Sequence, residues 1–167
     1  MQAPEQQSLF AGEAPALEGT IIFTIGHSTR RLEELVAVLL DHRIERLTDI
    51  RHFPSSRHNP QFNRAVLEEA LTRNGIEYIW LERLGGYRTG GYVAYMQTPD
   101  FAAGIETLQA MAREKRTAFM CAEVKWFKCH RRHVSDVLAA RGWQVIHIFD
   151  EKRVQKHALK TNTIRCN

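Results

Sequence analysis

Residues 117–140 read TAFMCAEVKWFKCHRRHVSDVLAA, and this stretch decides the fold class. The apolar run Thr117–Met120 is typical of a buried strand, and the apolar positions of Val134–Ala140 recur at helical spacing. Between them lie two thiols, a carboxylate, two imidazoles and two guanidiniums, from Cys121 to His133. Open α/β sheets place their ligand sites at such strand-to-helix turns. The stretch therefore predicts an α/β fold with a reactive site at this turn.

The rest of the chain repeats this alternation of strand and helix. The expected strands are 21–25, 44–50, 76–81, 117–121 and 144–149, and the expected helices are 32–40, 63–72, 92–97, 101–113 and 130–141. Such alternation predicts a single domain built on a mostly parallel five-stranded sheet, with helices on both faces. We expect this domain to span residues 20–155, between an irregular tail of residues 1–19 and a C-terminal tail of residues 156–167.

Composition narrows the class of protein. In 167 residues, 25% are charged and 44% hydrophobic, as in an ordinary globular domain. The net charge of +4 and the pI of about 9.1 favour an anionic partner, either nucleic acid or a phosphorylated small molecule. We find neither an apolar run long enough to span a membrane nor a signal peptide. Three cysteines, an odd number, argue against a disulfide framework and favour a reducing cytoplasm.

Chemically capable side chains follow most of the expected strands. Because parallel strands end at one edge of the sheet, we expect these side chains to converge there. They are His27, Ser28, Asp49, Arg51, Glu82, Cys121, Glu123 and Asp150.

Several short motifs in a fixed order resemble one family. They are Thr24-Ile-Gly-His-Ser28, Asp49-Ile-Arg51, Pro54-x-Ser56, Asn59-Pro-x-Phe62, Leu84-Gly-Gly86, Cys121-Ala-Glu123 and Cys129-His-Arg131. Together they resemble the DUF488 family over roughly residues 20–149, which implies an α/β sheet but no settled reaction. The family often has an acidic residue and a proline between the last two motifs. Here that segment is Val124-Lys-Trp-Phe-Lys128, which is basic and aromatic.

The first hypothesis for the site is catalysis. We expect the helix dipole and Arg131 to lower the pKa of Cys121 and so favour its thiolate. Glu123 is a candidate general acid or base if it is buried, and Asp49 is a candidate second carboxylate for a glycosidic cleavage. His27 is the fourth candidate catalytic residue. In the alternative interpretation, Cys121 is a small core residue and Glu123 pairs with an arginine.

The second hypothesis is a metal centre. Cys121, Cys129, His130 and His133 are ligand types that hold zinc or iron. Their spacing is not that of a zinc finger, and the adjacent Cys129 and His130 are awkward as ligands of one ion.

The third hypothesis is recognition of phosphate or nucleic acid. Arginine interleaved with aromatic residues suits a flipped base or a single strand, and a helix N-terminus attracts phosphate. The candidates are Ser28, Arg51, Arg57, Arg64, Tyr87, Arg88, Arg131 and Arg132. In the alternative interpretation, the loop arginines are merely solvated.

The N-terminal tail suggests a partner. Residues 6–10, QQSLF, resemble the peptide with which bacterial repair and replication proteins bind the DNA sliding clamp. In that interpretation Leu9 and Phe10 enter an apolar groove, while Gln6 and Ser8 contact its rim.

Taken together, these patterns predict a cytoplasmic enzyme that cleaves a bond in nucleic acid or a nucleotide, possibly in DNA repair. Arg51, Arg131 and His27 would stabilise negative charge. A Cys/His metal-binding protein and a non-catalytic DNA adaptor recruited to the clamp remain as alternatives.

Overall fold

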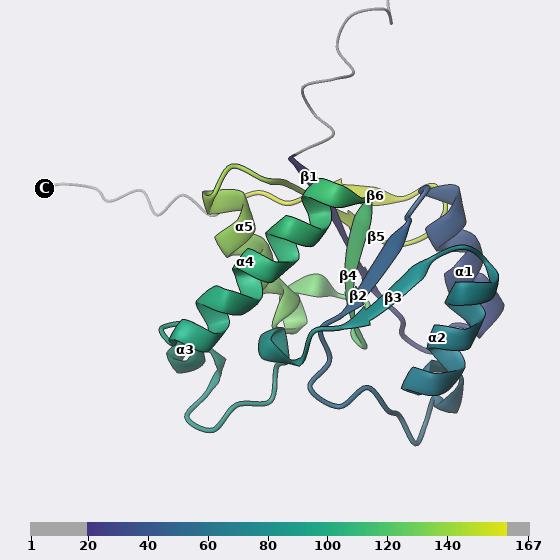
Figure 1. Ribbon diagram of the computed structural model, residues 1–167, viewed down its shortest axis with the longest axis horizontal. Coiled ribbons are helices and arrows are strands. Elements are labelled where there is room, and N and C mark those ends of the chain that lie inside the picture. The colour runs from purple at the N-terminus through teal and green to yellow at the C-terminus, as the bar shows by residue number, and fades with distance from the viewer. Residues whose placement is uncertain (1–19, 160–167) are drawn as a thin grey trace, which may run out of the picture.

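The computed structural model describes residues 20–159 and confirms the α/β class. A single six-stranded sheet has the order β3-β2-β4-β1-β5-β6 (Figure 1). The strands are β1 (Ile21–Gly26), β2 (Arg46–Asp49), β3 (Glu77–Trp80), β4 (Thr117–Cys121), β5 (Gln144–Ile148) and β6 (Val154–Lys156). The first five are parallel, so their C-terminal ends lie along one edge of the sheet. Strand β6 pairs antiparallel with β5.

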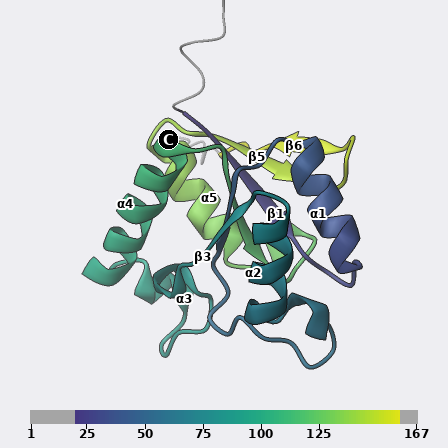
Figure 2. The ribbon, with the colours of Figure 1, turned by 45° about the vertical axis from the view of Figure 1, so that its right-hand side comes forward.

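Helices cover both faces of the sheet. They are α1 (Leu32–Asp41), α2 (Arg64–Arg73), α3 (Tyr92–Tyr95), α4 (Pro99–Glu114) and α5 (Arg131–Ala140), with short 3₁₀ turns η1 (Pro60–Phe62), η2 (Glu82–Leu84) and η3 (Trp126–Lys128). Helices α1 and α2 lie on one side, and α4 and α5 on the other (Figure 2). No described helix is long and apolar enough to cross a membrane.

Each face of the sheet has its own hydrophobic core. Successive side chains of a strand point to opposite faces, so Ile22 packs in the core under α4 and α5 while Phe23 packs in the core under α1 and α2. The central strand β4 is buried along its whole length, as expected for a parallel strand covered on both sides. These two cores hold the strand ends, and therefore the loops that follow them, in fixed positions.

The expectation of five strands was wrong, because β6 was missed. Its three residues, Val-Gln-Lys, are all exposed and carry no apolar pattern. The strand is held by backbone pairing with β5 instead. The fold also continues past residue 155, since Lys156 belongs to β6 and His157 is buried.

Candidate active site

A large pocket opens at the C-terminal edge of the sheet. It encloses about 1090 Å³, which is at the upper end for a small-molecule site. Its walls come from the loop after β1 (residues 27–29), the loop after β2 (from Arg51 to Asn59), residues 86, 87 and 92, and the loop from β4 into α5 (from Cys121 to His133). Segments distant in sequence therefore meet at one site, as the strand-end pattern predicts.

The loops after β1 and β4 are joined directly. The backbone N–H of His27 donates to the carbonyl of Cys121 at 3.0 Å, and that of Ser28 donates to the carbonyl of Ala122 at 2.9 Å. A Cβ atom on Gly26 would lie 1.8 Å from the carbonyl oxygen of Glu123. Only glycine allows this approach, so the Gly-His-Ser and Cys-Ala-Glu motifs form one floor of the pocket.

Two thiols lie in contact on this floor. The Sγ atoms of Cys121 and Cys129 are 3.0 Å apart. Burial raises the pKa of Cys121 well above its usual range. The hydrogen bond with Cys121, together with the charge of Arg131, lowers the pKa of Cys129 to about 6. The expectation of a lowered pKa at Cys121 is therefore wrong: desolvation favours its protonated thiol, and Cys129 is the cysteine whose pKa is lowered.

Arg131 organises this floor from beneath. Only 1% of its surface is exposed, and its Nε donates to Cys121 Sγ at 3.1 Å. Its other nitrogens donate to the Thr24 hydroxyl at 2.8 Å and to the carbonyls of Glu123 and Val124. No carboxylate of residues 20–159 forms an ion pair with it. Arg131 thus holds the loop and supplies an uncompensated positive charge beside the thiols.

A buried chain of hydrogen bonds continues from Arg131 across β1 and β5. Because the Thr24 hydroxyl accepts from Arg131, it can donate to Nδ1 of His147 at 3.0 Å. Nε2 of His147 then donates to His157 at 2.9 Å, and His157 donates to the Asp136 carboxylate at 2.7 Å. Burial lowers the pKa of His147 to about 3, so His147 takes part in this chain as a neutral imidazole.

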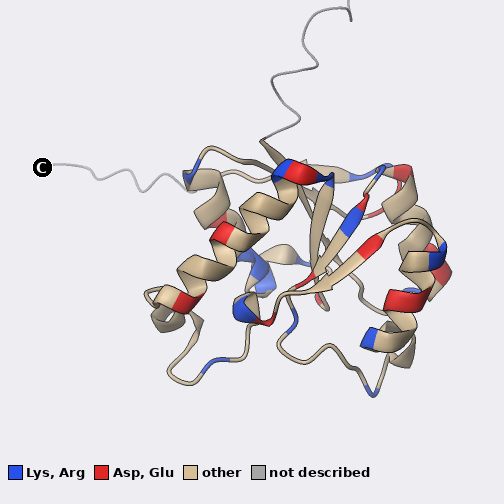
Figure 3. Ribbon diagram, viewed as in Figure 1, with Lys and Arg blue, Asp and Glu red and all other residues tan. Residues whose placement is uncertain are grey.

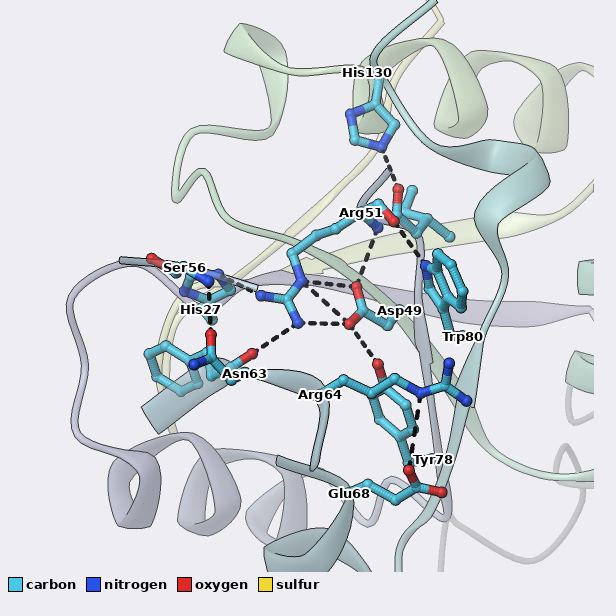
Figure 4. Close-up of polar contacts among 12 residues, drawn as sticks. His27, Asp49, Arg51, Ser56, Asn63, Arg64, Glu68, Tyr78, Trp80 and His130 are labelled. Atoms are coloured by element: carbon cyan, nitrogen blue, oxygen red, sulfur yellow. Dashed lines mark hydrogen bonds and ion pairs between the residues drawn. The ribbon is translucent and has the colours of Figure 1, made fainter. Parts of the chain in front are cut away.

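A second buried arginine lies at the end of β2 (Figure 4). Arg51 donates through Nε and Nη2 to the carboxylate of Asp49, with the shortest contact at 2.6 Å. The Tyr78 hydroxyl donates to the same carboxylate at 2.7 Å. Asp49 is fully buried and does not line the pocket. The structure therefore places Asp49 as the partner of Arg51 rather than as a carboxylate facing a ligand.

His27 connects Arg51 to the floor of the pocket. Its Nδ1 donates to the carbonyl of Ser28 at 2.8 Å, and its Nε2 faces Nη1 of Arg51 at 3.4 Å. These two contacts leave Nε2 as an acceptor. Burial lowers the pKa of His27 to about 4. His27 is therefore a neutral hydrogen-bonding group in the pocket at pH 7.

His130 joins the glycine loop to the end of β2. Its Nε2 donates to the carbonyl of Ile50 at 2.8 Å. A Cβ on Gly86 would lie 2.6 Å from His130 Nδ1, so glycine is needed there. Burial also lowers the pKa of His130 to about 4. The neutral ring of His130 thus holds the glycine loop at Gly86 next to the end of β2 at Ile50.

The four residues considered as metal ligands do not form a ligand set. Across residues 20–159, no three His, Cys, Asp or Glu side chains are placed to hold a metal ion. One ring nitrogen of His130 is bound to a carbonyl and the other lies against Gly86. We therefore do not assign zinc or iron to Cys121, Cys129, His130 and His133.

The candidate acid Glu123 is exposed at the pocket rather than buried. Its backbone carbonyl, not its carboxylate, receives the Arg131 guanidinium. Its carboxylate is consequently free to meet a ligand.

Half of the expected anion-binding side chains line the pocket: Ser28, Arg51, Tyr87 and Arg132. The other four do not. Arg131 is buried as described, and Arg57 is exposed but is not among the residues that line the pocket. Arg64 lies over Trp80, and Arg88 donates to the carbonyl of Gly85 and lies over Tyr95. These last two brace the fold instead.

Further pocket residues were not among the sequence candidates for ligand binding. They are Lys125, Lys128 and Phe127, from the loop between β4 and α5; Phe53, an aromatic residue that the sequence interleaves with the loop arginines, also lines the pocket. Basic residues occur on the loops along this edge (Figure 3). Sequence analysis could have found Lys125 and Lys128, because both belong to the basic, aromatic segment of residues 124–128. The lowered pKa of Cys129 also had a signal in the sequence, since this cysteine, and not Cys121, is adjacent to His130, the N-cap residue of α5.

Comparison with known proteins identifies one family. No curated protein and no solved structure matches the chain significantly. The family described as "Domain of unknown function DUF488" matches residues 31–138, which is more than half of the chain. This match contains most of the motifs that build the pocket, from Asp49 to Arg131. The chain therefore belongs to the DUF488 family.

Proposed function

We propose that this protein is an enzyme that acts on a nucleotide or on nucleic acid, with the thiolate of Cys129 as its nucleophile. One observation carries the proposal: a thiol with a pKa lowered to about 6 faces a pocket with basic and exposed aromatic walls. At pH 7 such a thiol is about nine-tenths ionised. Thiolates at helix N-termini beside a guanidinium are typical of nucleophilic catalysis.

The charge of the pocket supports an anionic ligand. Lys125, Lys128 and Arg132 line it and are exposed, and none of them forms an ion pair within the described part of the chain. Glu123 is the one acidic residue among the lining side chains. Phosphate groups are the anions that such loops favour.

The aromatic side chains of the walls support a base as part of the ligand. Phe53 is 62% exposed and Tyr87 is 77% exposed, and their ring centroids lie 6.1 Å apart. Stacking of a base on an aromatic ring contributes about 1–3 kcal/mol to binding. Exposed rings beside cations therefore suit a nucleotide better than a simple phosphate ester.

The proposed chemistry uses groups from the loops after β1, β2 and β4. Cys129 attacks an electrophilic atom of the ligand, and Glu123 serves as general acid or base for the leaving group. His27 accepts a hydrogen bond from Nη1 of Arg51, which holds its ring at the pocket. The lining cations Lys125 and Lys128 stabilise negative charge on the ligand. Asp49 takes no part, because it lies beneath the pocket.

A panel of labelled nucleotides, single-stranded DNA and duplexes that carry lesions tests this assignment. We expect turnover by the wild type and by Cys166→Ser, and a loss of at least about 100-fold for Cys129→Ser. Glu123→Gln should lose about 100-fold or more if it moves a proton. Equal turnover by Cys129→Ser would refute the nucleophile, and binding without turnover would favour the adaptor.

An activity on DNA would agree with the resemblance of residues 6–10 to a clamp-binding peptide. Gln6, Ser8, Leu9 and Phe10 lie outside the described residues, so recruitment to the sliding clamp remains part of the proposal. Pull-down with purified clamp should succeed for the wild type and fail for Leu9→Ala/Phe10→Ala. Undiminished capture of that variant would remove the clamp as a partner.

A further inference from the structure

The two thiols of the pocket floor differ in access. Both line the pocket, but Cys129 is partly exposed, whereas Cys121, at the end of β4, is only 2% exposed. Both are free in this structure. A small reagent that enters the pocket therefore meets Cys129 first, and the Cys121 thiol lies in contact with Cys129 and Arg131.

The separation of the thiols is short enough for a covalent bond. The Sγ atoms are 3.0 Å apart, and a disulfide bond is about 2.0 Å long, so roughly 1 Å of movement joins them. Cys121 is held by the pairing of β4 with β1, where it lies opposite Gly26. Cys129 lies on the loop between η3 and α5. The loop side therefore provides the movement.

Arg131 contacts both sulfurs. Its backbone N–H donates to Cys129 Sγ at 3.4 Å, and its Nε donates to Cys121 Sγ at 3.1 Å. The guanidinium contacts the Cys121 sulfur and its charge also lowers the pKa of Cys129, and a nearby cation stabilises whichever sulfur carries negative charge. It can thus support first the attack by Cys129 and then the attack by Cys121.

We propose that Cys121 and Cys129 are a reversible thiol–disulfide pair, in which Cys129 reacts with a small-molecule disulfide and Cys121 resolves the product. In the first step the Cys129 thiolate attacks one sulfur of the oxidant, the oxidant's S–S bond breaks, and one small thiolate leaves. In the second step the Cys121 thiol gives its proton to that thiolate and attacks Cys129 Sγ. The mixed disulfide breaks, and the second small thiolate leaves. The oxidant gains two electrons, and the protein gains one internal disulfide.

The disulfide would remove the pocket's nucleophile without any large change of fold. Its formation requires no nucleotide chemistry, so it can be tested whether or not a substrate is found.

The experiment uses the reduced full chain and oxidised glutathione as the probe at pH 7, followed by intact mass and peptide mapping. For the wild type we expect the loss of two hydrogens, a link between the Cys121 and Cys129 peptides, and recovery on adding dithiothreitol. The free-thiol count should fall from three to one, since the chain has three cysteines. Cys166→Ser should form the same link.

Cys121→Ser separates resolution from simple modification. This variant should keep glutathione on Cys129 in most molecules, whereas the wild type should keep it in less than about a tenth. Cys129→Ser should gain neither glutathione nor a link at Cys121. Equal, stable glutathione adducts in the wild type and Cys121→Ser would overturn the proposal, and so would a link that involves Cys166 instead.

Discussion

Two buried arginines lie at the same edge of the sheet and have opposite surroundings. Arg51 follows β2 and is paired with a buried carboxylate, Asp49, which also accepts from Tyr78. Arg131 opens α5 and is surrounded by a thiol, a hydroxyl and carbonyls. An arginine whose charge is matched holds loops together, and one whose charge is unmatched favours an anion nearby. The anion available to Arg131 is the Cys129 thiolate.

The largest expected effect comes from breaking the matched pair. Asp49→Asn leaves the Arg51 charge buried without a partner, so the free energy of unfolding should fall by about 3–5 kcal/mol. Urea denaturation measures this loss. Adding Arg51→Met to Asp49→Asn should recover part of it, because no buried charge then lacks a partner. Glu69→Gln, in the exposed pair with Arg73, should change stability by less than about 1 kcal/mol. A loss that small for Asp49→Asn would contradict the comparison.

Acid should destabilise both regions through their neutral histidines. Burial lowers the pKa of His27, beside Arg51, to about 4, and that of His147, linked to Arg131, to about 3. The unfolded chain takes up these protons near pH 6.5, and the folded chain does so only at lower pH. Stability is therefore complete above pH 6.5 and falls towards pH 4, by up to about 1.4 kcal/mol per pH unit for each histidine.

Unfolding curves between pH 7 and 4 test this dependence. His147→Gln should flatten the slope, and so should His27→Gln, while His58→Gln, at an exposed position, should not. A slope unchanged in both buried variants would show that these rings titrate alike in the folded and unfolded chain.

The smallest expected effect is on the reaction rate of the Cys129 thiol, which should depend on Arg131 and not on Arg51. Reaction of Cys129 with a chromogenic disulfide should rise with pH through a midpoint of about 6. Arg131→Lys should slow the reaction at pH 6 by roughly 3- to 10-fold, because an ammonium group cannot keep the several contacts of the guanidinium. Arg51→Lys is the matched control and should leave the rate nearly unchanged. Equal slowing by the two variants would mean that the unmatched charge has no special effect on the thiol.

The fold could be predicted from sequence wherever the signal is local. Apolar runs located all five parallel strands, although Ile44–Ile50 proved to be the shorter β2. The convergence of His27, Arg51 and Cys121 at one edge followed from parallel topology alone. Strand β6 was missed because backbone pairing, which has no side-chain pattern, forms it.

The roles of individual site residues depended on contacts between distant segments. The carboxylate of Asp49 accepts a hydrogen bond from Tyr78, which is 29 residues away along the chain. Which cysteine is desolvated depends on the path of the loop between them. Neither the composition nor the spacing of the motif contains that path.

The stacking of Trp126 on His147 has a practical consequence. Their ring centroids are 4.2 Å apart and the stacked planes are nearly parallel, with an angle of 4° between them. Trp126 belongs to the same loop as Cys129, whereas the chain's other two tryptophans, Trp80 and Trp143, lie in β3 and just before β5. Its indole is therefore an intrinsic fluorophore positioned to register displacement of that loop, so emission can follow events at the thiols in real time without an added label.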